Sequence, residues 1–140
     1  YSSTCAPGAD KSMSVTRSAS WLALAGLIAT PAVLAEDADS GKAVFERLCA
    51  ACHATTTEPG GPPTGPTLAG VFGRKSASVK EFAMYTPALK AHDVTWNDKS
   101  LDEFLANPML KVPGTMMVMP VTDAKERSDV IAYLKTLKGK

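Results

Sequence analysis

The chain has 140 residues, of which 45% are hydrophobic and 21% are charged. This balance excludes a disordered chain and suits one domain. The formal net charge of +1 excludes the basic excess that nucleic-acid binding needs, so we expect no nucleic-acid partner. Aromatic residues make up only 6% of the chain, which is few for a core built from side chains alone. A buried prosthetic group would supply the missing apolar volume.

The first 35 residues have the pattern of a secretory signal rather than of a folded domain. Arg17 precedes an apolar run at 21–29, and the compact residues Val33 and Ala35 stand at the −3 and −1 positions of a cleavage site. We expect cleavage after Ala35, with 1–12 as upstream sequence and 36–140 as the mature domain. The alternative is that the uncharged stretch 18–35, about the shortest that spans a bilayer, is kept as an anchor.

The first half of the predicted domain contains one helix and one long loop. Residues 39–49 show helical spacing of apolar residues, with Val44 and Leu48 on one face and Gly41 and Phe45 on a neighbouring one. Residues 53–73 are rich in Gly, Pro and Thr and are predicted to be irregular. So long a loop in so small a domain is expected to be functional or to wrap around something.

The second half predicts three further helices. Thr86 followed by Pro87 indicates an N-cap and the first residue of a short helix ending at Ala91. Residues 100–103 have the pattern of a capping box, which opens a helix that stops before Pro108. Residues 111–121 are predicted to be irregular, and a last helix starts near Thr122 with Val130, Ile131, Leu134 and Leu137 on one face. The prediction is an all-α domain of about four short helices and long loops.

Residues 49–53 read Cys-Ala-Ala-Cys-His, the signature of covalent c-type haem attachment. Two thiols three residues apart at a helix end reach the two vinyl groups on one edge of a porphyrin. His53 then lies under the iron as the proximal ligand. A thioredoxin-like dithiol, a zinc site and a plain disulfide are alternatives. The first lacks its βαβ context, the second lacks ligands, and the third leaves the histidine unexplained.

The second axial ligand decides what such a haem does. A thioether from methionine favours ferrous iron and raises the reduction potential. Spacing alone does not choose among the candidates, which include His92 and five methionines: Met84, Met109, Met116, Met117 and Met119.

Taken together, residues 39–138 resemble the class I cytochromes c. Residues 65–75 are similar to the family's G-P-x-L-x-G-x-x-G-R stretch, 113–117 to its P-G-T-K-M segment, and 129–134 to its C-terminal helix. The resemblance implies the cytochrome c fold around one covalent haem c. It also implies that Gly41 and Phe45 of the first helix contact Val130 and Tyr133 of the last.

The resemblance also assigns roles to individual residues. His53 and Met117 correspond to the iron ligands, and the carbonyl of Pro66 to the acceptor for the proximal histidine. The haem propionates would be bound or neutralised by Arg74, Tyr85 and Trp96. Phe104 stands where the family commonly has a tyrosine, and Met116 replaces a lysine near the haem edge. The presence of Met116 and Met119 beside Met117 leaves a ligand swap open.

We therefore expect a one-electron carrier, not an enzyme, in the periplasm of a Gram-negative bacterium. Its partners would be redox proteins of a respiratory or photosynthetic chain: a cytochrome bc complex, an oxidase, a reaction centre or a periplasmic dehydrogenase. The mature domain would be a monomer without membrane insertion. Arg47, Lys75, Lys80 and Lys111 are candidates for a docking ring. The alternatives are a membrane-tethered cytochrome subunit of a dehydrogenase or oxidase, and a peroxidase or ligand-binding haem protein with labile methionine ligation.

Overall fold

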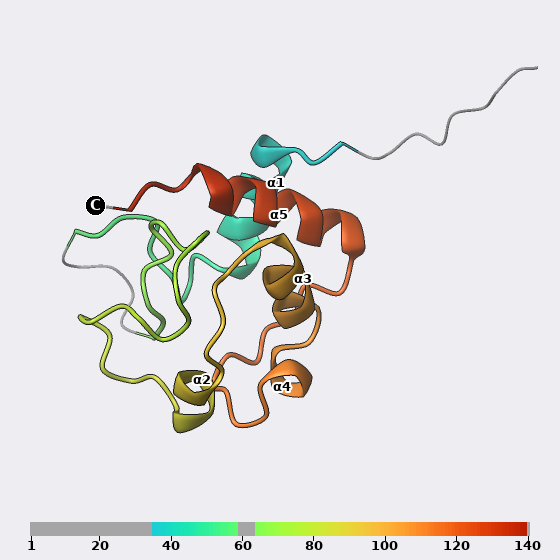
Figure 1. Ribbon diagram of the computed structural model, residues 1–140. Helices are drawn as coiled ribbons and strands as arrows, with labels where there is room; N and C mark the ends of the chain where they lie inside the picture. The colour runs from blue at the N-terminus through green and yellow to red at the C-terminus, as the bar shows by residue number, and fades with distance from the viewer. Residues whose placement is uncertain (1–34, 59–63, 140) are drawn as a thin grey trace, which may run out of the picture. The chain divides into compact units, whose positions relative to one another are not determined.

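The computed structural model describes residues 35–58 and 64–139, and these stretches contain five helices. They are α1 (Ala38–Leu48), α2 (Pro87–Ala91), α3 (Asp98–Ala106), α4 (Pro108–Lys111) and α5 (Ala124–Thr136) (Figure 1). Within the described residues there is no strand, only an isolated bridge between Lys75 and Thr95. The all-α prediction is confirmed. The predicted leader, apart from Ala35, lies outside the described residues.

The helix starts follow from side chains that bind free backbone N–H groups. The predicted start of α2 is confirmed, since the Thr86 hydroxyl accepts a hydrogen bond from the N–H of Leu89 at 3.2 Å. Helix α1 begins slightly earlier than predicted because Asp37 caps it. The predicted start of α5 near Thr122 is confirmed to within two residues, with Asp123 as its cap.

The predicted capping box at 100–103 is wrong, because the cap of α3 lies about one turn earlier. The N-cap is Asn97, whose side chain accepts from the N–H of Ser100 at 3.0 Å. The Ser100 hydroxyl in turn accepts from the N–H of Asn97 at 2.9 Å. Serine therefore occupies the position that Glu usually takes in this motif, and the helix begins at Asp98.

Helix α4 was not expected, because the sequence predicted only a stop before Pro108. Asn107 is extended and caps a new turn, because its side chain accepts a hydrogen bond from the N–H of Leu110 at 3.0 Å. Proline suits the first position of that turn, where its missing N–H has no partner to lose. The irregular segment consequently begins at Val112 rather than at Lys111.

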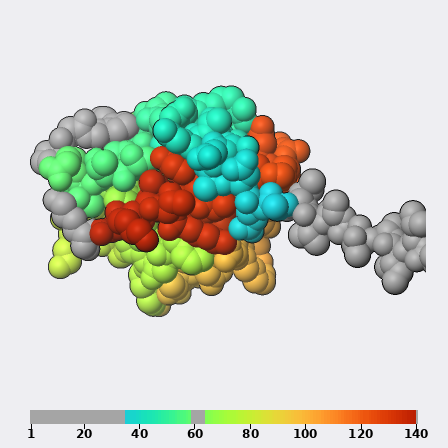
Figure 2. All heavy atoms as spheres, turned by 90° about the horizontal axis from the view of Figure 1, so that it is seen from above, coloured from blue at the N-terminus to red at the C-terminus, as the bar shows by residue number. Residues whose placement is uncertain are grey.

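Helices α1 and α5 cross at one end of the domain, with α3 beside α5 and with α2 and α4 at the other end (Figure 1). The view from above shows α5 lying directly against α1 (Figure 2). Gly41 lies at the crossing, where a Cβ atom would be 3.0 Å from the Cβ of Tyr133 and would overlap the carbonyl of Asp129. The rings of Phe45 and Tyr133 pack with centroids 5.4 Å apart. The predicted contact between the first and last helices is therefore present.

The buried core links all parts of the described domain. It joins Phe45 of α1, Trp96 before α3, Phe104 of α3 and Val130 of α5. The ring centroids of Trp96 and Phe104 are 5.2 Å apart. No helix within 35–58 and 64–139 is long and apolar enough to cross a bilayer.

Candidate haem site

The two cysteines of the Cys-x-x-Cys-His motif lie at the C-terminal end of α1. Cys49 is the C-cap, and its N–H donates to the carbonyl of Phe45 at 2.8 Å. The next turn holds His53, whose N–H donates to the carbonyl of Cys49 at 2.9 Å. The helix end therefore presents both sulfurs and the imidazole from one rigid turn, as the sequence predicts.

Both thiols are free rather than joined as a disulfide. Cys49 is buried, whereas Cys52 is exposed. Burial, and to a smaller extent the nearby Cys52, raises the pKa of the Cys49 thiol to about 11. A redox-active dithiol needs a nucleophilic cysteine with a lowered pKa, and Cys49 has the opposite shift.

The His53 ring is held in one orientation by the loop that follows the motif. Its Nδ1 donates to the carbonyl oxygen of Pro66 at 2.8 Å. Burial lowers the pKa of His53, and the bond to Pro66 opposes that change. A neutral ring with its proton on Nδ1 leaves the Nε2 lone pair for a metal, which is the tautomer that a haem iron requires. The predicted partnership of His53 and Pro66 is present.

Two residues around these ligand candidates had no role in the sequence prediction. A Cβ at Gly65 would be 2.6 Å from Cε1 of His53, so only glycine allows the Pro66 carbonyl to approach the ring. Thr115 is buried, and its hydroxyl accepts from the N–H of Met117 at 3.3 Å. Their positions in the sequence could have indicated these roles, because a glycine directly precedes Pro66 and a threonine stands two residues before Met117.

The structure separates the three neighbouring methionines. The side chain of Met117 is half-buried and packs against the core, whereas Met116 and Met119 are exposed. Of the three, Met117 is thus the one already directed inward. His92, the other imidazole, ends α2 with its ring centroid 6.1 Å from that of Trp96. Its buried Nε2 has no hydrogen-bond partner among the described residues.

The residues predicted to surround the propionates are half-buried or buried. Arg74 donates to the carbonyl oxygens of Ala69 at 2.7 Å and Thr67 at 2.8 Å, which holds its guanidinium against the 67–69 loop. Burial lowers the pKa of Arg74, and Tyr85 opposes this, but a guanidinium stays charged. The Tyr85 hydroxyl accepts from the N–H of Val79 at 3.4 Å, and burial raises its pKa. Trp96 lies in the core.

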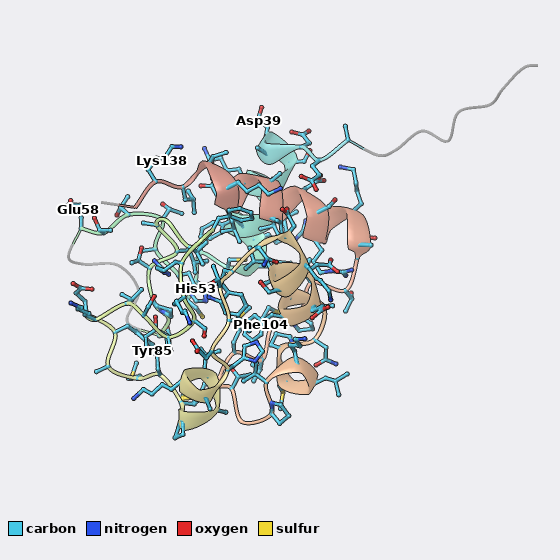
Figure 3. The ribbon with its side chains drawn as sticks, in the orientation of Figure 1. Asp39, His53, Glu58, Tyr85, Phe104 and Lys138 are labelled. Atoms are coloured by element: carbon cyan, nitrogen blue, oxygen red, sulfur yellow. The ribbon has the colours of Figure 1, made fainter. Side chains whose placement is uncertain are left out.

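Figure 3 shows how these parts surround one interior region. His53 lies on the inner side of the loops that follow α1, Phe104 lies across the interior on α3, and Tyr85 lies below His53, above α2. The donor set fits haem c: two free thiols, a neutral imidazole oriented by a carbonyl, an inward thioether and an apolar lining. No group of three or more His, Cys, Asp or Glu side chains suited to a bare metal ion occurs in the described part of the chain.

Three of the four candidates for a docking ring form ion pairs within the domain. Arg47 binds Glu126 at 2.7 Å, and Lys75 binds Asp93 at 2.6 Å. Lys111 contacts Glu103. The docking role of these cations stays a prediction.

Comparison with known proteins finds one matching family and several similar sequences. The family model described as cytochrome c matches residues 38–138. Cytochrome c of Euglena viridis is 46% identical over 103 residues, covering 73% of this chain and 98% of that relative. Cytochrome c of Tetrahymena pyriformis is 44% identical over 102 residues, covering 72% and 89% respectively. Cytochrome c-type cyt cy of Rhodobacter capsulatus is 41% identical over 108 residues, covering 76% of this chain and 52% of that relative.

Proposed function

Because the chain belongs to the cytochrome c family and so carries covalently attached haem c, we propose that it moves single electrons between proteins of a periplasmic electron-transfer chain. It is an electron-transfer protein rather than an enzyme, and redox proteins are its partners. The cytochrome bc complexes, oxidases, reaction centres and periplasmic dehydrogenases named above are the proposed partner classes. The observation that carries the proposal is the single turn after α1 that presents Cys49, Cys52 and an oriented His53.

The proposed roles follow from the contacts on each side of the site. Cys49 and Cys52 attach the haem, and His53 supplies the proximal nitrogen while Pro66 holds its proton on Nδ1. Met117 supplies the second ligand, because it is the inward methionine of its loop. The haem contributes the change between Fe(III) and Fe(II).

The remaining residues control the surroundings of the haem. We assign the propionate region to Arg74, Tyr85 and Trp96. The guanidinium of Arg74 offsets negative charge there, and its two backbone carbonyl acceptors prevent it from swinging into solvent. Phe104 excludes water from the ligand side without offering a hydroxyl to the Met117 sulfur. A dry and rigid site keeps reorganisation small when the charge of the iron changes.

The test is an optical spectrum of the purified protein, oxidised and then reduced, for the parent and for three variants. Met117→Ala is expected to lose the weak far-red sulfur-to-Fe(III) band, whereas the control variants Met116→Ala and Met119→Ala keep it. A high-spin parent spectrum contradicts the proposal, because it means an open coordination position. Loss of the band in a control variant instead moves the ligand to that methionine.

The export proposal has a separate test. Expression with the full leader, followed by mass measurement of the product, is expected to give a chain starting at Glu36 in the periplasmic fraction. Two contacts of the described domain suit this start: Lys135 binds Glu36 at 3.3 Å, and the N–H of Asp37 donates to Asp129 at 2.9 Å. Both contacts lie within the first two residues after the proposed cleavage site. Recovery in membranes with the leader intact would favour the tethered alternative.

A further inference from the structure

The segment that carries Met117 makes few bonds of its own. Among the described residues, the stretch 116–120 makes one hydrogen bond, which the N–H of Met117 donates to the hydroxyl of Thr115 at 3.3 Å. Every side chain of this stretch other than Met117 is exposed. The place of the proposed second ligand therefore depends on how the two ends of its segment are held.

The first end is fixed by bonds within its own stretch of chain. Val112 is buried directly after α4, and its N–H donates to the carbonyl of Pro108 at 2.8 Å. The N–H of Thr115, which is also buried, donates to the carbonyl of Val112 at 3.0 Å. These bonds join close neighbours in the sequence, so they do not depend on another helix.

The second end is held by bonds to α3 and α5, which lie beside each other (Figure 1). Val121 is 2% exposed, and its N–H donates to the carbonyl of Leu105 in α3 at 2.8 Å. Arg127 of α5 donates from Nη1 to the carbonyls of Val121 at 3.0 Å and Thr122 at 3.1 Å. Nε of the same guanidinium donates to Asp102 of α3 at 2.6 Å. Arg127 thus ties this end of the segment to both helices.

The guanidinium of Arg127 suits this role because it binds three oxygen atoms at once. A guanidinium is planar and always charged, so its N–H groups point in fixed directions and form strong bonds. The Arg127 side chain is 13% exposed, so water competes little for these bonds. The adjacent Glu126 differs, because its pair with Arg47 joins side chains that are 39% and 55% exposed. An ion pair as exposed as that one contributes little to stability.

We propose that Arg127 is a positioning residue that keeps Met117 at the iron by holding the second end of its segment. This inference rests on the proposed function, in which Met117 is the second ligand. Asp102 fixes the direction of the guanidinium, and the two carbonyl oxygens attach the chain to it. Without these bonds, the segment opens more often at Val121 while the helices remain folded.

The test measures how fast imidazole binds to the oxidised, haem-loaded protein. Imidazole takes the place of Met117 only after the methionine sulfur has left the iron, so the rate at saturating imidazole reports the opening of the segment. Arg127→Gln is expected to raise this limiting rate by ~tenfold or more, because it removes the charged donor of two carbonyl oxygens. Arg127→Lys keeps the charge, but its single nitrogen cannot replace the guanidinium fork, so its rate should also be raised. The matched control is Glu126→Gln, which breaks the exposed pair between α5 and α1 and should leave the rate within about twofold of the parent.

A second measurement separates opening of the segment from a general loss of stability. The limiting rate is measured at several guanidinium concentrations below the unfolding transition. Opening of one segment exposes little surface, so the raised rate of Arg127→Gln should change little with denaturant, whereas unfolding of the whole domain gives a steep rise. On heating, the far-red band of this variant should also disappear at a lower temperature than its helical circular dichroism.

Three results would overturn the proposal. The first is a limiting rate in Arg127→Gln equal to that of the parent, and the second is an equal rise in Glu126→Gln. The third is a raised rate that climbs steeply with denaturant, because Arg127 would then act only through the stability of the whole domain. The parent spectrum reports on the proposed function separately. If the far-red band is absent from the parent, the assignment of Met117 fails, whereas if the band is present the rates judge Arg127 alone.

Discussion

Replacing Gly41 with alanine tests whether the α1–α5 crossing depends on the absence of a side chain. In an isolated helix this change is favourable by ~1 kcal/mol, because alanine is the better helix former. In this structure the new Cβ would be 3.0 Å from the Cβ of Tyr133 and would overlap the backbone carbonyl of Asp129. Carbon atoms in contact are normally ~3.5–4.0 Å apart, so the helices must separate by on the order of 1 Å.

The energetic consequence follows from what that separation breaks. Overpacking against a backbone atom that cannot rotate away belongs at the upper end of the usual cost of ~1–3 kcal/mol. Loosening the ring contact between Phe45 and Tyr133, with centroids 5.4 Å apart, adds ~0.5–1.5 kcal/mol. After the gain in helix propensity, we expect a net loss of about 2–3 kcal/mol in the free energy of unfolding. For a domain of this size that lowers Tm by roughly 10–20 °C.

The assay is guanidinium unfolding followed by far-ultraviolet circular dichroism on the haem-loaded protein. The control is Ala43→Gly, an exposed position on the same helix, which should lose about 1 kcal/mol through helix propensity alone. One variant thus replaces glycine with alanine and the other replaces alanine with glycine, within the same turn of α1. If Gly41→Ala proves as stable as the parent or more so, the close approach of the helices is not what requires glycine, and the reasoning fails.

Three further variants test other contacts. Asn97→Ala should cost about 1 kcal/mol in thermal unfolding by removing the α3 cap, and no loss would mean that Ser100 caps the helix instead. Burial raises the pKa of Tyr85, so its contribution to the free energy of unfolding should be fully present below pH ~10, the pKa of tyrosine in the unfolded chain, and should fall as the pH rises above that value. Tyr85→Phe should remove this part of the decline, and an unchanged pH profile of the variant would contradict the reasoning. Arg74→Leu leaves two carbonyl oxygens without their charged donor, and we expect a loss of about 2–3 kcal/mol in denaturant unfolding together with a lower reduction potential. An Arg74 variant with an unchanged potential would place the guanidinium away from the propionates.

The local chemistry of this protein could be predicted from its sequence. The haem motif is five consecutive residues, and its spacing is set by covalent geometry, so no distant contact is needed to identify it. The start of α2 was predictable because both of its signals are local. Thr86 binds an N–H of the first turn, and Pro87 has no N–H that needs a partner. The face of α5 that bears Val130 and Leu134 follows from helical periodicity alone.

The tertiary structure decided the choices that local spacing left open. Three methionines within four residues are equivalent by spacing, and it is packing against the core that separates Met117 from Met116 and Met119. Similarly, the sequence does not show which carboxylates lie near Arg47 and Lys75, and folding brings Glu126 to the first and Asp93 to the second. Several polar side chains near the starts of α3 and α4 are able to cap a helix. Only the structure shows that Asn97 and Asn107 do so. The local sequence determines which interactions a residue is able to make. The residues that folding brings next to it determine which of those interactions form.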